Sequence, residues 1–302
     1  MKVRRCQLPG NAWPELPLEQ WQKTYAPLHM WTQIVGKTRL ALSPNINHWW
    51  QVPLYLTSRG LTTSAIPYQG RILEIEFNFL EQRLGISLSD GQHQSLPLRP
   101  QSVASFYTEY MAALRSLGIG VAIWPMPAEV PNPIRFDRDT QHASYDGEAA
   151  QRFWRILTLI EPIFQEFRAR FIGKHSPVHF FWGSFDLAST RFSGRRAPAR
   201  PDADRITREA YSHEVISAGF WPGGGDVKGP AFYVYAAPEP AGFKTARVKP
   251  KEAFYSPLGE FLLMYDDVRK SASPKEMLLD FLQSTYEAAA DSGKWPRSEC
   301  EA

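Results

Sequence analysis

The sequence predicts an α+β protein in which mainly antiparallel sheets pack against four long helices. Four stretches carry apolar residues at helical spacing, and the segments between them are short, rich in aromatic and aliphatic residues, and bounded by turn residues. These elements run in the order helix, strands, helix, and the same order then occurs a second time. The four helices are expected over residues 18–42, 103–117, 147–171 and 274–293.

The first half is expected to begin with the helix over residues 18–42. Pro27 interrupts its apolar pattern and Gly36 weakens its end, so we expect a kink or two shorter helices. Strands should follow over residues 49–58, 71–79 and 83–88, with a return strand through Leu96 after the turn Ser89-Asp90-Gly91.

The helix over residues 103–117 has the clearest apolar stripe of the first half. Ser102 is placed to cap its start and Gly118 to stop it. A short strand is expected next, over residues 119–123. The Pro-rich stretch 125–133 then marks a boundary. The resulting halves, residues 1–135 and residues 136–302, are expected to pack as one compact unit.

The second half is expected to begin with the helix over residues 147–171, which Asp146 or Ser144 caps and Pro162 bends. The last helix starts at Ser273-Pro274-Lys275-Glu276, which has the form of a capping box with proline at the first helical position. Between these helices, strands are expected over residues 178–192, 213–220, 231–237 and 260–265.

The repeated element order predicts an internal two-fold repeat. Sliding the chain by 131 positions places His48-Trp49-Trp50 on His179-Phe180-Phe181, with Leu56 on Leu187 and Ser58 on Ser189. Two aromatic strands also match by chance, so the alternative is an accidental likeness. Superposition of residues 18–118 on residues 148–293 distinguishes the two.

Composition and charge favour a globular protein and argue against a polyanionic partner. Hydrophobic residues make up 43% of the chain and aromatic residues 13%, including 10 Trp, which suits a large core or the wall of a flat pocket. The 34 Lys and Arg residues against 31 Asp and Glu leave a net charge of only +3. A nucleic-acid-binding protein needs a dense basic stripe instead.

Cysteine use and hydropathy predict a cytoplasmic protein. The two cysteines, Cys6 and Cys300, lie near opposite ends of the chain, which argues against a disulfide framework and suits a reducing compartment. The first ten residues have no apolar run of the kind found in a secretory signal. A membrane span needs about 18 or more consecutive apolar residues, and the sequence has no such run.

The motifs of several common sites are missing from the sequence. Gly223-Gly224-Gly225 lacks the Lys-Ser/Thr of a phosphate loop and does not fit the dinucleotide fingerprint, so a hairpin turn is favoured over an anion nest. There is no Gly-x-Ser-x-Gly elbow and no His-Glu-x-x-His helix. Any site must therefore depend on polar residues placed among apolar ones.

One such residue is Asp186, in the continuous strand expected over residues 178–192. Alternation along that strand puts Asp186 and Trp182 on one face and His179 and Arg191 on the other. An aspartate among aromatic neighbours must be paired, hydrogen-bonded or shifted in pKa. Asp186 is therefore either a catalytic carboxylate, or the partner of a histidine, or a structural residue bonded to backbone or arginine.

Histidines of the second half are the next source of chemistry. His175, His179 and His213, with Glu214 beside His213, could bind a divalent metal ion or transfer protons. Satisfied core histidines are the alternative, because the spacing from His175 to His179 runs through a proline. The candidate catalytic residues are thus His179, Asp186, His213 and Glu214, and the candidate metal ligands are His175, His179 and His213.

Aromatic and arginine side chains are the candidates for ligand contact. Trp49, Trp50 and Trp182 could form the apolar walls of a pocket between the halves, where concave sites are common. Arg191 could clamp an anion, and it opens a run of six arginines that ends at Arg208. That run is either a solvated basic loop or a surface for an acidic partner.

Several strings of residues carry a resemblance to a known family. They are Trp13-Pro14-Glu15-Leu16-Pro17, Leu28-His29-Met30-Trp31-Thr32-Gln33-Ile34-Val35-Gly36-Lys37, Asn47-His48-Trp49-Trp50, Gly60-Leu61-Thr62-Thr63, residues 176–187 and Tyr211-Ser212-His213-Glu214. With these strings the chain resembles, nearly end to end, an uncharacterised bacterial domain-of-unknown-function family (DUF5996-like). The resemblance implies a bacterial, full-length single module and brings no activity, cofactor or catalytic residue with it.

These residues predict a small-molecule enzyme or ligand-binding protein with a pocket between the two halves. Acid–base or metal-assisted hydrolysis is the reaction class that His, Asp, Glu and Arg side chains would support. The alternative is a non-catalytic protein that binds an acidic partner or nucleic acid through the Arg191–Arg208 loop. Binding that collapses between low and moderate salt would indicate the alternative.

Overall fold

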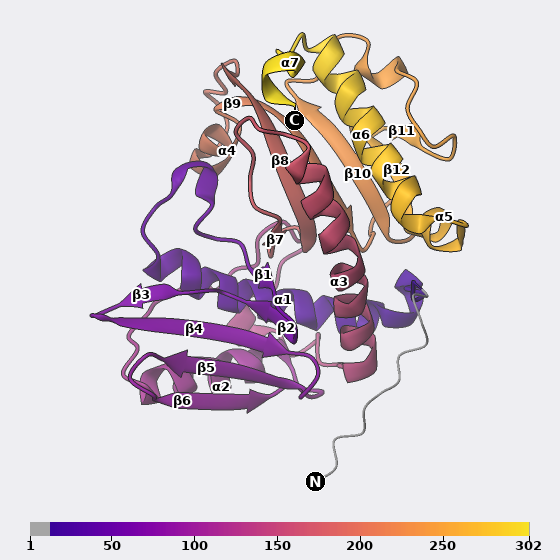
Figure 1. Cartoon of the computed structure of the whole chain (residues 1–302). Helices are drawn as coiled ribbons and strands as arrows, with labels where there is room; N and C mark the ends of the chain where they lie inside the picture. Colours follow the sequence, from indigo (N-terminus) through magenta and orange to yellow (C-terminus); the bar gives the residue numbers. More distant parts are fainter. Residues whose placement is uncertain (1–12, 302) are drawn as a thin grey trace.

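The computed structural model describes residues 13–301 and confirms the α+β class. Two antiparallel sheets of six strands each occur in this part of the chain, and long helices cover one face of each sheet (Figure 1). The expectations that concern Cys6 and the first ten residues lie outside the described residues.

The N-terminal half contains one sheet and two long helices. Its elements are α1 (Leu18–Leu42), η1 (Asn47–Trp49), β1 (Tyr55–Leu56), β2 (Gly60–Thr62), β3 (Ile66–Tyr68), β4 (Arg71–Asn78), β5 (Arg83–Leu88), β6 (His93–Pro97) and α2 (Val103–Ser116). The strands form a meander in the order β1-β2-β4-β5-β6, and β3 also pairs with β4. Helix α1 contacts both α2 and β3.

Helix α1 is one continuous helix of 25 residues, so the expectation of two shorter helices is wrong. Every residue from Pro27 to Arg39 is buried. A helix that is buried all round lies in the core, where packing on every side offsets the hydrogen bond that a proline removes. The apolar periodicity is weak for the same reason, because polar residues of α1 are buried as well.

Gly36 is the position at which the C-terminal half docks closely on α1. A Cβ atom at residue 36 would lie 2.2 Å from the indole ring of Trp182, which therefore occupies the space that a side chain would take. The same indole donates from Nε1 to the Val52 carbonyl oxygen at 2.7 Å. His29, two turns earlier on α1, places Nε2 3.0 Å from the carbonyl oxygen of Trp182 and 2.8 Å from that of Gly183.

The C-terminal half contains the second sheet, which is also flanked by long helices. Its elements are η2 (Phe136–Arg138), α3 (Gly147–Ala169), β7 (His179–Phe181), β8 (Asp186–Arg196), α4 (Arg205–Ala210), β9 (His213–Trp221), β10 (Ala231–Ala237), η3 (Phe243–Thr245), β11 (Phe254–Ser256), β12 (Glu260–Met264), α5 (Tyr265–Lys270), α6 (Pro274–Ser292) and α7 (Arg297–Cys300). The strand order is β11-β12-β10-β9-β8-β7, all antiparallel.

The aromatic run over residues 178–192 is a hairpin and not one continuous strand. The chain turns at Trp182–Phe185, where Phe185 adopts φ 60°, and β7 then pairs with β8. His179 lies opposite Ala188, and Phe181 lies opposite Asp186. Directly opposed residues share a face of the sheet. The structure therefore brings His179 and Asp186 to the same face, whereas the continuous strand would separate them.

Local signals for helix ends are confirmed in part. Ser102 accepts a hydrogen bond from the Ser105 amide, and Asp146 accepts from the first amides of α3, as expected of caps. Ser273 makes no side-chain capping bond, so the expected capping box does not form. The strand expected over residues 119–123 is also wrong, because this segment is irregular.

The two sheets meet edge to edge through one pair of residues. Leu54 and Phe180 exchange both backbone hydrogen bonds, each at 2.9 Å, beside the edge strands β1 and β7. Each half has six strands between long helices, but α4 interrupts the strands of the second half and the two sheets differ in strand order, which counts against an internal repeat. The repeat and the boundary near residue 135 both stay predictions.

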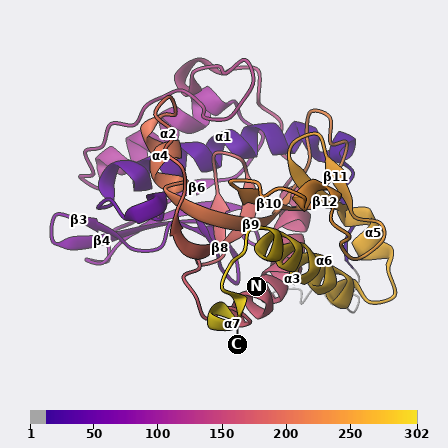
Figure 2. The same ribbon diagram turned by 90° about the horizontal axis from the view of Figure 1, so that it is seen from above.

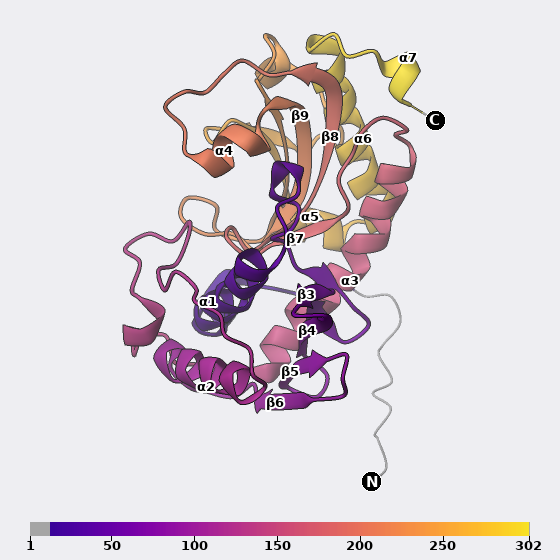
Figure 3. The same cartoon turned by 90° about the vertical axis from the view of Figure 1, so that its left-hand side faces the viewer.

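The C-terminal sheet has one face covered by long helices and one face turned toward the N-terminal half. Helices α3 and α6 contact β8, β9 and β10 on the first face. Figures 2 and 3 show α4 and α1 on the side of the sheet opposite to α6. We call this second side the inner face, and it carries the site residues described next.

The close contact between Gly36 and Trp182 gives a first testable prediction. Gly36→Ala should lower the free energy of unfolding by about 1–3 kcal/mol, because the added methyl group overlaps the indole ring. The sign is diagnostic, since glycine to alanine inside a helix otherwise stabilises by about 0.5–1 kcal/mol. Urea unfolding measures the change.

Gly120→Ala is the matched control, because the nearest atom to its added Cβ would be the Tyr68 hydroxyl at 4.0 Å. The double variant Gly36→Ala, Trp182→Leu should lose less stability than the two single changes added together. A Gly36→Ala protein that is more stable than the parent would contradict the docking contact.

Candidate functional site

The inner face of the C-terminal sheet carries short side chains on β8 and β9, with tyrosine rings on β10 beside them. The strand register places Ala188 opposite Gly219, and Thr190 opposite Ser217. Tyr233 and Tyr235 stand on the neighbouring strand β10, opposite Gly219 and Ser217. The face thus comprises His179, Phe181, Asp186, Ala188, Thr190, Ser217, Gly219, Tyr233 and Tyr235.

Asp186 is a buried carboxyl group. Among the described residues, its side-chain hydrogen-bond partners are all hydroxyl groups. It is 5% exposed and accepts hydrogen bonds from the Ser184 and Tyr233 hydroxyls, both very short. No Lys, Arg or His nitrogen among the described residues lies within 4.0 Å of it. Burial raises the pKa of Asp186 above its usual value, although the two hydroxyls act in the opposite direction.

Tyr233 reaches Asp186 by lying across a neighbouring strand. A Cβ atom at Gly219 would lie 2.2 Å from the Tyr233 ring, so only glycine admits this position of the ring. Burial and the nearby Asp186 raise the pKa of Tyr233 well above its usual value. The Tyr233 hydroxyl therefore stays protonated and donates to the carboxylate.

Further acidic and tyrosyl groups surround this pair. Burial and the negative charge of Asp186 raise the pKa of Glu260 to about 7. The Tyr235 hydroxyl lies 2.9 Å from that of Tyr211, and the rings of Tyr233 and Tyr235 stack with centroids 6.0 Å apart. We call Ser184, Asp186, Tyr233, Tyr235 and Glu260 the acid–tyrosine cluster.

His179 lies on the same face and is buried without a hydrogen-bonding partner. It is 1% exposed, and neither of its ring nitrogens has a partner in the structure. The rings of Trp50, Tyr55 and Phe181 surround it, with centroids 5.2–5.8 Å away. Burial first, and then the positive charges of Arg39 and Arg168, lower the pKa of His179 to about 3, so the imidazole is neutral.

His213 belongs to a different group at the end of the sheet. Its ring centroid lies 5.7 Å from that of His48, which in turn lies 5.5 Å from the ring of Trp50. Trp50 also contacts His179 and therefore connects the two groups of histidines. His48, which the sequence analysis did not select as a site residue, could only have been found through this long-range contact.

Two of the predicted site residues point away from the inner face, because their strand positions have the opposite parity. Glu214 accepts from Ser193 at 2.8 Å and pairs with Arg195 at 2.7 Å, beside a hollow of about 260 Å³ near α6. Arg191 is 1% exposed and donates to the Phe167 carbonyl oxygen, with the Phe167 ring 3.6 Å away. The structure therefore does not bring Glu214, expected as a catalytic residue, or Arg191, expected as an anion clamp, together with Asp186 on the inner face.

The tryptophans expected to line a pocket, and the histidines expected to bind a metal ion, lie only partly at the inner face. Trp50 lies at the inner face, whereas Trp182 packs on α1 and Trp49 lies under Arg205, 5.5 Å from ring centroid to guanidinium. His175 pairs with Arg191 on the helix-covered side, away from His179. Within residues 13–301, no three His, Cys, Asp or Glu side chains are arranged to hold a metal ion.

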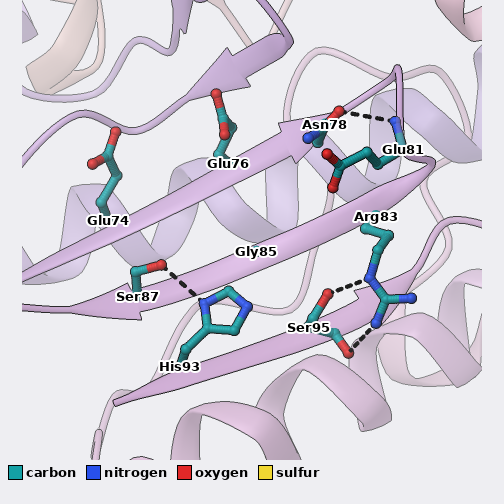
Figure 4. Close-up of a pocket in the computed structure, with 9 residues that line it drawn as sticks. All are labelled: Glu74, Glu76, Asn78, Glu81, Arg83, Gly85, Ser87, His93 and Ser95. Atoms are coloured by element: carbon teal, nitrogen blue, oxygen red, sulfur yellow. Dashed lines mark hydrogen bonds between the residues drawn. The ribbon is translucent and has the colours of Figure 1, made fainter. Parts of the chain in front are cut away.

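A second hollow, of about 400 Å³, lies over the exposed face of the N-terminal sheet (Figure 4). Its acidic side chains already have partners: Glu74 accepts from Thr62, Glu76 from Thr57, and Glu81 pairs with Arg59. The alternation of exposed and buried residues along β4 is the sequence signal of this polar face. The carboxylates of this lining are therefore satisfied within the protein.

The chain belongs to the Family of unknown function (DUF5996), whose model matches residues 13–302. The resemblance expected from the sequence strings is therefore confirmed. No curated protein and no solved structure matches the chain significantly. No helix within residues 13–301 combines the length and the apolar character that crossing a membrane requires.

The buried histidines predict a loss of stability in acid. Burial lowers the pKa of His29 to about 4 and that of His179 to about 3, against about 6.5 in the unfolded chain. Their contribution to the free energy of unfolding is therefore complete above about pH 6.5 and is lost as the pH falls toward these values. Each histidine adds a slope of at most about 1.4 kcal/mol per pH unit.

His179→Phe keeps a ring at this position and should reduce the slope, as measured by urea unfolding at several pH values between about 7.5 and about 4.5. His93→Phe, at an exposed position on the other sheet, serves as the control variant. A pH slope in His179→Phe equal to that of the parent would show that His179 is not a buried neutral histidine.

Proposed function

We propose that the protein binds a small polar molecule on the inner face of the C-terminal sheet and that Asp186 exchanges a proton with it. The single observation that carries this proposal is the buried Asp186 carboxyl group, which two hydroxyls hold and which no cation neutralises. A buried carboxyl group with a raised pKa at the junction of two halves is a candidate for acid–base chemistry.

The hydroxyl partners favour proton exchange over a purely structural role. A buried carboxylate with a structural role is usually paired with a cation. Protonation of that carboxylate removes the ion pair and leaves the cation without a counter-charge. Hydroxyl groups donate to the ionised form and accept from the protonated form. Asp186 can therefore change its protonation state without leaving Ser184 or Tyr233 unsatisfied, which is what a general acid or base requires.

The neighbouring residues support binding of a molecule with both polar and flat parts. Ala188 and Ser217 carry short side chains near the centre of the face and the Tyr233 ring lies over Gly219, while Trp50 and Tyr235 stand at its sides. Aromatic rings at such positions bind flat groups and also exclude water. The unpartnered nitrogens of His179 and Nε of Arg39 are polar groups that lack partners within the protein.

Metal-assisted hydrolysis is a weaker proposal than acid–base chemistry, because the three candidate histidine ligands do not converge. The alternative of an acidic partner on the Arg191–Arg208 loop is also weakened. Arg191 is enclosed by Phe167 and Tyr286, and Arg195 is already paired with Glu214.

The Asp186 proposal predicts that Asp186→Asn and Tyr233→Phe weaken ligand binding without unfolding the protein. Compounds that copurify with the parent protein are identified by native mass spectrometry, and their affinities are measured by isothermal titration calorimetry. Each variant should reduce affinity by about tenfold or more and cost about 1–3 kcal/mol of stability, because one buried hydrogen-bonding partner changes.

Tyr255→Phe is the matched control, because Tyr255 donates to Glu239 in a similar hydroxyl–carboxylate pair at the surface. Infrared spectra recorded over a pH series should show a carboxyl group that titrates above the range of an exposed aspartate and that is absent in Asp186→Asn. Unchanged ligand affinity in both Asp186→Asn and Tyr233→Phe would disprove the proposal.

A further inference from the structure

A group of cationic side chains gathers at the end of the C-terminal sheet, next to α4. His48 comes from η1, Lys174 from the loop after α3, and His213 from the start of β9, where Arg196 pairs opposite it. Helix α4 contacts η1 and brings Arg205 over Trp49. We call His48, Lys174, Arg196 and His213 the basic cluster.

The hydrogen bonds define the protonation state of His48. Lys174 Nζ lies 2.7 Å from His48 Nε2, and an ammonium group can only donate, so Nε2 accepts. The proton of His48 is therefore on Nδ1, which donates to the Glu209 carbonyl oxygen at 3.2 Å. His48 is 6% exposed, and this neutral tautomer is fixed on both sides.

No carboxylate neutralises the basic cluster. Among the described residues, neither His48, Lys174, Arg196 nor His213 has a carboxylate oxygen within 4.0 Å. The Lys174 ammonium instead lies 4.9 Å from the centroid of the Phe192 ring and 5.6 Å from that of Trp50. Aromatic faces attract a cation but do not carry a compensating charge.

The positive charges of the cluster act on one another. Burial and then Lys174 lower the pKa of His48. Burial, Lys174 and Arg196 lower the pKa of His213. The other groups that face the cluster are Arg205 above Trp49 and the backbone carbonyl of Glu209, so no side chain in contact supplies a negative charge. A bound anion would remove this mutual repulsion.

The backbone under the cluster is held in an unusual conformation. His48 and Trp49 have φ values of 58° and 61°, which are uncommon for two successive residues other than glycine. Such strain persists where the surrounding structure imposes it, and it concentrates at binding sites. Here the strained turn presents the His48 ring to Lys174 and His213.

We propose that the basic cluster binds a phosphate group, or an oxyanion of equal charge, carried by a small molecule. The four residues come from four segments that meet at one end of the sheet instead of forming a stripe, and the net charge of the chain is only +3, which fits a compact anion better than a nucleic acid. Lysine is a common phosphate ligand, and histidine joins it when protonated. The proposal uses other residues than the Asp186 proposal and stands independently of it.

Anion binding at this cluster is linked to proton uptake. The anion attracts the Lys174 ammonium away from His48 Nε2, which frees that nitrogen to take a proton. A neighbouring negative charge also raises the pKa of both histidines. Affinity for a dianion of fixed charge must therefore increase as the pH falls through the range in which histidine titrates.

The experiment is calorimetric titration of the full chain with sulfate, whose charge is constant between about pH 6 and about pH 8, on either side of the usual histidine pKa of about 6.5. Ionic strength is held constant with chloride. We expect saturable binding with proton uptake, seen as a dependence of the heat on the buffer. Affinity should be about tenfold or more higher at the lower pH. Inorganic phosphate should compete for the same site.

Lys174→Gln, at an exposed position, should fold normally and weaken sulfate binding by about tenfold or more, and His213→Gln should reduce the proton uptake and leave the share of His48. Lys228→Gln, an exposed lysine in the loop before β10, is the matched control and should bind as the parent does. Equal losses in Lys174→Gln and Lys228→Gln, or binding that does not saturate, would overturn the proposal. If a single-stranded oligonucleotide binds more tightly than phosphate, the ligand of this cluster is a nucleic acid and the small-anion proposal is wrong.

Discussion

The packing of the β7–β8 turn against helix α1 is the contact on which the rest of the structure depends. Trp182 occupies the space that Gly36 leaves open, and its indole also hydrogen-bonds to Val52 in the following loop. The turn therefore determines where β8 starts, and Asp186 is the first residue of that strand. The site of one half is thus positioned by a helix of the other half.

Acidic and basic side chains lie in two separate groups on this side of the sheet, and neither group neutralises the other. Carboxyl groups gather around Tyr233, while cations gather around His48, and the described residues contain no ion pair between the two groups. Keeping such groups partly buried without partners costs stability, because desolvation favours their neutral forms. A fold retains that cost where the groups serve a ligand, so the separation itself supports a binding role for this face.

The sequence predicted the class of the fold because local periodicity decides it, and α2 and α3 begin at the predicted residues with the predicted caps. The sequence did not predict the features that depend on tertiary contacts. The turn at Phe185 needs a positive φ at a non-glycine residue, which no local rule indicates, and missing it put His179 and Asp186 on opposite faces. Alternation from the true start of β8 also explains why Arg191 points to the helices. The contact between His48 and Lys174 joins residues 126 positions apart, which no spacing pattern shows.

The reciprocal backbone bonds between Leu54 and Phe180 have a consequence for solubility. The outer strand of a sheet offers unsatisfied amide and carbonyl groups that can recruit strands from other molecules. In this chain β1 and β7 are such outer strands, and each lies against the other beside this single bridge. Opening of the junction would uncover two templates for intermolecular pairing at once, so the joined halves protect one another from aggregation.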